Sequence, residues 1–305
     1  MGAAQGSTYV LVLAGGEGTR LASFTRDARG HIVPKQFALR FAGETLFEAA
    51  LRRAGRLVPV PQITAIVAAH HRRWWRPQVE GRVGDVVVQP SDRGSAAAAL
   101  LGLQHVLVRD PAARVVLLPS DHATKDEDAW TRTLGDVAEA SHEGGDPVVL
   151  LGMPCEDLGH GYGWVVPGES RSGLRDAVVG LHHGLAALVA EGHDVSGALL
   201  DSLVIAGSAA GLVALHAGAV PEMVSAYHAA LGTRVEAAPA IVQVLYSSLP
   251  KRDLSRDVLA RATEALSVVR GRRCGWADVD TPERLASLGR VLEIPRRPVH
   301  RPLFG

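Results

Sequence analysis

The fold and the chemistry of this chain start from the stretch Leu13-Ala14-Gly15-Gly16-Glu17-Gly18-Thr19-Arg20-Leu21, which continues the apolar run Tyr9–Leu13. An apolar run that breaks into glycines predicts a buried strand and then a tight turn where a helix would otherwise begin. Because glycine has no Cβ, backbone N–H groups in this turn can face an anion, and Arg20 can fork onto phosphate oxygens. Lys35, in Pro34-Lys35-Gln36-Phe37, adds a mobile point charge. The stretch therefore predicts a phosphate-binding loop.

Two common phosphate-binding patterns are absent from this stretch. A dinucleotide fingerprint needs a third glycine three residues after Gly18, where Leu21 stands. The sequence also contains no glycine-lysine-serine or glycine-lysine-threonine of a P-loop. A glycine turn that only relieves steric strain stays open as an interpretation, so the phosphate hypothesis depends on residues elsewhere in the chain.

Composition limits the classes of protein that this chain can belong to. With 305 residues, of which 47% are hydrophobic, the chain can bury a large core. Its formal net charge of zero gives no global field that would attract nucleic acid or an anionic membrane, so we expect neither as a partner. We find no signal-peptide pattern and no apolar stretch that could span a bilayer. Cys155 and Cys274 are far apart and lack the close spacing of cysteines in metal-binding motifs. We therefore expect a globular, cytoplasmic protein.

Short apolar runs alternate with alanine-rich and leucine-rich stretches of helical length, which is the rhythm of βαβ units. The strands that we expect are Tyr9–Leu13, Ile63–Ala68, Asp85–Val88, Arg114–Leu118, Val148–Met153 and Gly163–Val166. The clearest helices are Thr45–Arg56, Ser95–Val108 and Asp128–Glu143, and we also expect helix over Asp253–Val269. The predicted fold class is α/β: a Rossmann-like, open, mostly parallel twisted sheet flanked by helices, with a short C-terminal helical extension.

Three segments are expected to meet at one edge of this sheet, because ligands of open α/β sheets bind beyond the carboxyl ends of the strands. Gly15, Gln89 and Asp121 all follow predicted strands. Asp121 is the first acid after the apolar strand that ends in Leu117-Leu118-Pro119-Ser120-Asp121-His122, and a carboxylate there suits Mg²⁺. Since Mg²⁺ is commonly held by one or two carboxylates, we choose Asp278 as the partner. Either aspartate could instead cap a helix or a turn.

Together, the glycine turn, Thr19-Arg20 and Pro34-Lys35 resemble the signature of the sugar-1-phosphate nucleotidyltransferases, and Lys35-Gln36-Phe37 is most similar to their mannose-1-phosphate guanylyltransferase branch. Pro119-Ser120-Asp121-His122 and Gly275-Trp276-Ala277-Asp278-Val279 are similar to the metal-binding aspartate motif and a later motif of that family. The resemblance implies a GT-A-like fold, with residues 1–250 as the nucleotidyltransferase core and residues 251–305 as a segment that adds a metal-site motif and a short tail.

The resemblance also implies a role for each matching residue. Arg20 and Lys35 would be catalytic, and Asp121 and Asp278 would bind Mg²⁺. The nucleotide would be bound by Leu13, Ala14, Gly15, Gly16, Gly18, Thr19, Gln89, Gly94 and Ser95, with Ser95 as the N-cap of the helix that follows. Tyr162, Gly163 and Asp201 would bind the sugar. The implied reaction couples a sugar-1-phosphate to a nucleoside triphosphate and releases pyrophosphate. The resemblance favours mannose-1-phosphate and GTP as the two substrates.

The sugar half of the chain departs from the family. Gly180-Leu181-His182-His183-Gly184 stands where the family has a glutamate-lysine-proline segment, and Leu200-Asp201-Ser202 stands in place of tryptophan-asparagine-threonine. Two alternatives therefore stay open. The chain could be a noncatalytic regulatory subunit that binds a nucleotide sugar, or an enzyme that uses UTP or dTTP with another sugar-1-phosphate. A homodimer also stays open.

Overall fold

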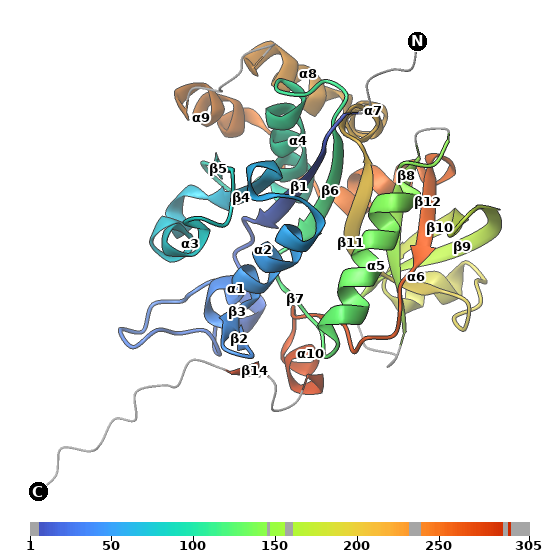
Figure 1. Ribbon diagram of the computed structural model, residues 1–305, viewed down its shortest axis with the longest axis horizontal. Helices are drawn as coiled ribbons and strands as arrows, with labels where there is room; N and C mark the ends of the chain where they lie inside the picture. The colour runs from blue at the N-terminus through green and yellow to red at the C-terminus, as the bar shows by residue number, and fades with distance from the viewer. Residues whose placement is uncertain (1–5, 145–146, 156–160, 232–238, 289–291, 294–305) are drawn as a thin grey trace, which may run out of the picture.

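The computed structural model of the protein describes residues 6–144, 147–155, 161–231, 239–288 and 292–293. Its centre is a nine-stranded sheet in the order β5-β4-β1-β6-β11-β8-β12-β10-β9 (Figure 1). The strands are β1 Thr8–Ala14, β4 Ile63–Ala68, β5 Asp85–Gln89, β6 Arg114–Pro119, β8 Val148–Pro154, β9 Gly163–Ser172, β10 Arg175–His183, β11 Leu199–Ser208 and β12 Leu266–Arg270. The pairings make every strand except β10 and β11 run in the direction of β1. The open, mostly parallel sheet is confirmed.

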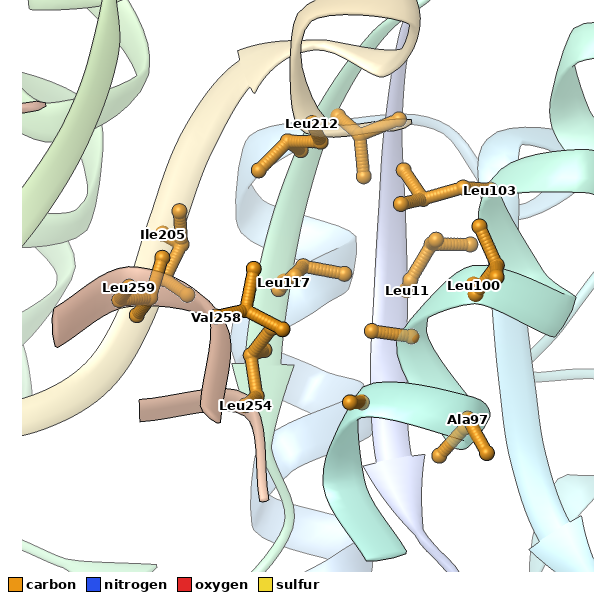
Figure 2. Close-up of a cluster of buried hydrophobic side chains, with 14 of the residues drawn as sticks. Leu11, Ala97, Leu100, Leu103, Leu117, Ile205, Leu212, Leu254, Val258 and Leu259 are labelled. Atoms are coloured by element: carbon orange, nitrogen blue, oxygen red, sulfur yellow. The ribbon is translucent and has the colours of Figure 1, made fainter. Parts of the chain in front are cut away.

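Helices cover both faces of this sheet, because side chains of a strand alternate between its two sides. Val10 and Val12 of β1 belong to a buried cluster that includes side chains of α2 Leu46–Leu57, α3 Arg72–Val79, α5 Glu127–Ala140 and α6 Leu185–Ala190. Leu11 points to the opposite face, which is covered by α4 Gly94–Leu107, α7 Ala209–Ala219, α8 Pro221–Leu231 and α9 Pro239–Ser248. Figure 2 shows Leu11 on that face, close to Leu100 and Leu103 of α4.

The first two-thirds of the chain follow the expected pattern closely. All six predicted strands are present, and most extend one residue or more beyond the expected end. The three predicted helices are α2, α4 and α5. Thr45 caps α2 in a capping box with Glu48, and the Asp126 carboxylate accepts from two backbone N–H groups at the start of α5.

Ser95 is a different case, and its prediction as an N-cap is wrong. The N-cap of α4 is Arg93, and the helix begins at Gly94. Ser95 Oγ accepts a hydrogen bond from the Leu254 backbone N–H at 2.8 Å instead, so this side chain joins two segments that are distant in the sequence.

The helix predicted over Asp253–Val269 is wrong in its second half. Residues Leu254–Ala265 form short helical turns, η4 Leu254–Val258, η5 Leu259–Arg261 and η6 Thr263–Ala265, but Leu266–Arg270 is strand β12. β12 lies inside the main sheet, parallel to β8 and antiparallel to β10. Its apolar side chains are buried on both faces of the sheet, and a short run of this kind has the same pattern as a buried piece of helix.

The remaining elements lie around the carboxyl ends of the parallel strands. They are the short helices η1 Thr19–Leu21, α1 Lys35–Ala38, η3 Ala69–His71 and α10 Pro282–Ser287, and the short strands β2 Arg40–Phe41, β3 Glu44–Thr45, β7 His122–Ala123, β13 Ala277–Asp278 and β14 Leu292–Glu293. The short helix η2 Val60–Gln62 is the exception, because it comes directly before β4 and lies at the amino end of that strand. β7 and β13 form a two-stranded ribbon. None of the helices in the described parts of the chain is long and apolar enough to cross a bilayer.

Candidate active site

Four charged side chains from three distant segments meet beyond the carboxyl ends of β1 and β6. Lys35 Nζ lies 2.9 Å from Asp121 Oδ2, 3.7 Å from Asp278 Oδ1 and 2.9 Å from Asp280 Oδ1. Arg20 joins the same cluster through an ion pair between its Nη1 and Asp280 Oδ2. The structure thus brings together the residues proposed from the sequence as catalytic and metal-binding, and adds Asp280.

The glycine loop is held against Lys35 by features that the sequence specifies locally. Gln36, which is buried, donates from Nε2 to the Ala14 and Gly16 carbonyl oxygens at 3.2 and 2.9 Å. Gly18 has a φ of 63°, and a Cβ at this position would lie 2.9 Å from the Lys35 backbone nitrogen. Only glycine adopts this backbone conformation without strain at such a close approach. Gly18 is therefore required for the loop to pack on α1.

The β7–β13 ribbon brings Asp278 to Asp121. Asp278 pairs with His122 across this ribbon, and the Val279 N–H donates to the Asp121 carbonyl oxygen at 3.2 Å. On the Cys274 side, the backbone N–H groups of Lys125 and Asp126 both donate to the Cys274 carbonyl oxygen. These bonds fix the register of two segments that lie about 150 positions apart in the sequence.

The sequence interpretation missed Asp280. The chain turns back after Asp278, with the Asp280 N–H donating to the Asp278 carbonyl oxygen at 3.0 Å, so that both carboxylates face Lys35. The only signal in the sequence is a second acid two residues after Asp278. That spacing by itself is equally consistent with an exposed polar turn.

The electrostatics of the cluster favour the ionised form of Asp121. The Lys35 side chain is only 7% exposed, whereas the three carboxylates keep 27–28% of their surface in solvent. Burial acts to raise the pKa of Asp121, but the charge and hydrogen bond of Lys35, together with His122, outweigh it and hold this pKa below its usual value. Burial lowers the pKa of the neighbouring His122, which favours its neutral form.

The donor set at this site fits Mg²⁺. Asp121, Asp278 and Asp280 offer hard oxygen ligands that converge on one cation, the Lys35 ammonium, and their partial exposure leaves room for water or phosphate ligands. The two His-containing groups that the described residues also bring together, Glu17 with His70 and His71, and His182 with Glu191 and His193, carry nitrogen ligands, which suit softer metals better.

The predicted nucleotide-base segment lies on the same edge of the sheet. A Cβ at Gly15 would overlap Gln89 Nε2, so the glycine loop and the end of β5 are in close contact. Gly94, with a φ of 85°, approaches the Arg252 carbonyl oxygen so closely that a Cβ would overlap it. Tyr246 donates from its hydroxyl to Gln89 Oε1 at 3.4 Å. Segments around Tyr246 and Arg252 therefore support this loop.

The other predicted nucleotide-binding residues are placed as follows. Leu13 and Ala14 end β1, and Gly16 is exposed, with open space where a Cβ would stand. Thr19 begins the short helix η1 and is exposed. Gln36 bonds to the carbonyl oxygens of Ala14, at the end of β1, and of Gly16, in the glycine loop that leads to Thr19.

The predicted sugar-binding residues fall into two groups. Tyr162 is connected through Arg284 to Asp278, a predicted metal ligand. The guanidinium carbon of Arg284 lies 3.4 Å from the Tyr162 ring centroid, and its Nη1 donates to Asp278 Oδ2 at 2.7 Å. Gly163 packs on Asp201, whose carboxylate accepts from Ser255 Oγ at 2.5 Å and from the Leu203 N–H at 2.9 Å. Burial raises the pKa of Asp201.

Comparison with known proteins gives a consistent result. The nucleotidyl transferase family model matches residues 9–178. The chain is 26% identical over 161 residues to the alginate biosynthesis protein AlgA of Pseudomonas aeruginosa, and 26% identical over 163 residues to a mannose-1-phosphate guanylyltransferase of Salmonella montevideo. These matches cover 51% and 52% of this chain but only 31% and 33% of the relatives, so the chain spans about a third of the length of these curated relatives.

Among solved structures, the fold is similar to one described as mannose-1-phosphate geranyltransferase from Thermus thermophilus. The TM-score is 0.74, with 30% sequence identity, and the match covers 90% of this chain and 76% of the other.

Proposed function

The chain belongs to the nucleotidyl transferase family, and we propose that it couples mannose-1-phosphate to the guanylyl group of GTP, giving a nucleotide sugar and pyrophosphate. The proposal of these two substrates is supported by the names of distant relatives, one of which is a mannose-1-phosphate guanylyltransferase. It is also supported by Lys35-Gln36-Phe37, in which Lys35 faces the carboxylates and Gln36 holds the glycine loop.

One observation carries the proposal. Lys35 Nζ, which is buried, lies 2.9 Å from Asp121 Oδ2 and 3.7 Å from Asp278 Oδ1 at the edge of the sheet where the glycine loop ends β1. Nucleotidyl transfer needs mainly alignment and charge neutralisation, as other phosphoryl-type transfers do. A buried ammonium beside two carboxylates and a loop of backbone N–H groups meets both needs.

The reaction that we propose is a direct displacement. An oxygen of mannose-1-phosphate attacks the α-phosphorus of GTP in line, a new P–O bond forms, and the bond to the β-phosphate oxygen breaks, so that pyrophosphate leaves. In this proposal Lys35 neutralises charge on the reacting phosphates, and the exposed Arg20 holds the leaving pyrophosphate. No covalent intermediate on the protein is required.

Mg²⁺ would be held by Asp121 and Asp278, and when bound it would supply positive charge and fix the orientation of the phosphate oxygens. The role of the chain is to position these two carboxylates. The β7–β13 ribbon sets their separation, and the Arg284 guanidinium fixes the orientation of Asp278.

A second candidate function is a noncatalytic subunit that binds a nucleotide sugar. It is favoured by the sugar side, where the Asp201 carboxylate is engaged by Ser255 and by the backbone of its own strand. It is also favoured by Gly180-Leu181-His182-His183-Gly184, which carries no acid and lysine pair. A third candidate is an enzyme of the same reaction type that uses UTP or dTTP with another sugar-1-phosphate.

These candidates are separated by analysing the products of a grid of reactions. GTP, UTP and dTTP are each incubated with mannose-1-phosphate or glucose-1-phosphate in the presence of Mg²⁺, and the nucleotide sugars are identified by mass spectrometry. GDP-mannose as the main product supports the proposal, whereas another nucleotide sugar keeps the reaction type and replaces the substrates. No product in any reaction, together with retained binding of a nucleotide sugar, supports the subunit.

A further inference from the structure

Asp280 bridges the two cations that we assign to phosphate. One carboxylate oxygen, Oδ1, lies 2.9 Å from Lys35 Nζ, and the other, Oδ2, forms an ion pair with Arg20 Nη1. Two oxygens of one phosphate group would contact two cations in the same way. The carboxylate of Asp280 therefore takes the place of an anionic ligand on Arg20 and Lys35.

The charge of the cluster makes this contact significant. Three carboxylates, Asp121, Asp278 and Asp280, are balanced by three cations, Lys35, Arg20 and Arg284, so the cluster carries no excess positive charge that would attract an anion. A free polyphosphate would add uncompensated negative charge beside these carboxylates, and it would have to displace Asp280 from both Arg20 and Lys35. A polyphosphate that carries a divalent cation brings less negative charge, and its cation gives the carboxylates a new partner.

The two bonds of Asp280 differ in strength. The Arg20 side chain is 66% exposed, and an exposed pair of this kind contributes little stability, so it can be exchanged for another ligand. Lys35 is buried and remains paired with Asp121 and Asp278 when Asp280 leaves it. Asp280 itself is 27% exposed, so its side chain can turn toward solvent without disturbing the packed core.

We propose that Asp280 is a specificity-determining residue that excludes metal-free polyphosphate from Arg20 and Lys35 and admits the metal-bound form. The inference rests on the proposed function, because it takes these two cations as the phosphate ligands. In the absence of a divalent cation the carboxylate keeps its place between them. A metal-bound polyphosphate replaces it, since the positive charge of the metal then holds the carboxylates that the ammonium and guanidinium release.

The test is the binding of inorganic pyrophosphate, measured by titration calorimetry with a chelator or with Mg²⁺. The wild type is compared with Asp280→Asn and Asp280→Ala, so that the result does not depend on one substitution. The control is Asp136→Asn, which breaks another aspartate–arginine ion pair, with Arg272, on the outer helix α5. Thermal unfolding of each variant verifies that it is folded.

In the presence of the chelator, we expect both Asp280 variants to bind pyrophosphate at least about tenfold more tightly than the wild type. This is the effect expected when one unit charge within a few ångströms of the ligand is removed. With Mg²⁺ the difference should shrink to about twofold or less, and Asp136→Asn should follow the wild type throughout. Equal affinities of folded wild type and Asp280 variants in the chelator would overturn the inference, including the case in which none of them binds.

The outcome is separable from that of the proposed function. If the wild type forms a nucleotide sugar but the Asp280 variants gain no affinity for pyrophosphate, only the inference about Asp280 fails. If the variants gain affinity but no protein forms a nucleotide sugar, Asp280 controls a phosphate site in a protein that does not catalyse the proposed reaction.

Discussion

The guanidinium of Arg284 lies over the ring of Tyr162, with its central carbon 3.4 Å from the ring centroid. The same guanidinium donates from Nη1 to Asp278 Oδ2 at 2.7 Å. Because a planar guanidinium can stack on a ring and bond to a carboxylate at once, one buried side chain connects the predicted sugar side to a predicted metal ligand.

Arg284→Lys is expected to raise the Mg²⁺ concentration needed for half-maximal activity by about tenfold, the usual effect of losing a group that orients a metal ligand. The lysine keeps the charge but cannot both stack on Tyr162 and fork onto Asp278. Rates measured over a range of Mg²⁺ concentrations test this expectation. An unchanged Mg²⁺ dependence in a folded variant would show that Arg284 does not position Asp278.

Gly18→Ala is expected to destabilise the protein by about 1–2 kcal/mol, because alanine is strained at a positive φ and its Cβ would press on the Lys35 backbone nitrogen. Gly16→Ala is the matched control in the same loop, since a Cβ there meets no atom within 4 Å. Urea unfolding of both variants measures the difference. Equal stability of the two would contradict the close packing of Gly18 on α1.

Glu127→Gln tests a half-buried ion pair beside the site. Glu127 Oε1 accepts from Arg53 Nη2 at 2.6 Å, and Arg53 is buried. Burial acts to raise the pKa of Glu127, but the hydrogen bonds and charges of Arg53 and Arg52 outweigh it, so this pKa lies below its usual value. The stability that this pair contributes is therefore present at neutral pH and lost as the pH falls through the lowered pKa of the folded state.

We expect Glu127→Gln to lower the free energy of unfolding at pH 7 by about 3 kcal/mol, because Arg53 is left buried without its carboxylate. The loss should become smaller as the pH falls below about 4, where the wild type loses the same contribution. Urea unfolding of both proteins at several pH values provides the measurement. A loss that stays constant across this range would show that the charge of Glu127 is not the cause.

Asp201→Asn is expected to act in the opposite direction. Burial raises the pKa of Asp201, so its ionised form is disfavoured in the folded state, and the cost appears as the pH rises through the raised pKa. The asparagine should raise the melting temperature at pH 7, with a gain that fades near pH 4. It keeps an oxygen acceptor for the Leu203 N–H. A lower melting temperature at pH 7 would indicate that the charge of Asp201 stabilises the fold.

Much of the fold could be predicted because its signals are local. The strand of residues 8–14 is apolar and ends in glycines, and Thr45 and Asp126 start helices by bonding to nearby backbone. β12 could not be recognised in the same way. Its neighbours in the sheet, β8 and β10, lie far from it in the sequence. The pattern of a short apolar run does not indicate whether the run will pair with such distant strands.

The residues of the site also differ in whether their sequence signals are local. Arg20, Lys35, Asp121 and Asp278 each stand in a local motif, so their types and spacing already point to phosphate and metal chemistry. Asp280 and Arg284 stand outside such motifs. Asp280 gains its role from contacts with Lys35 and Arg20, 245 and 260 positions away, and Arg284 gains its role by joining Tyr162 to Asp278. Only folding brings such pairs together.

The most direct test of the central claim is the rate of pyrophosphate release from GTP and mannose-1-phosphate in the presence of Mg²⁺, for the wild type, Asp121→Asn and Asp136→Asn. We predict turnover by the wild type and by Asp136→Asn, and a loss of at least about a hundredfold in Asp121→Asn, as expected when one preorganised charge is removed. Full turnover by folded Asp121→Asn, or no turnover by a wild type that still binds the nucleotide sugar, would contradict the assignment of this cluster as a centre of nucleotidyl transfer.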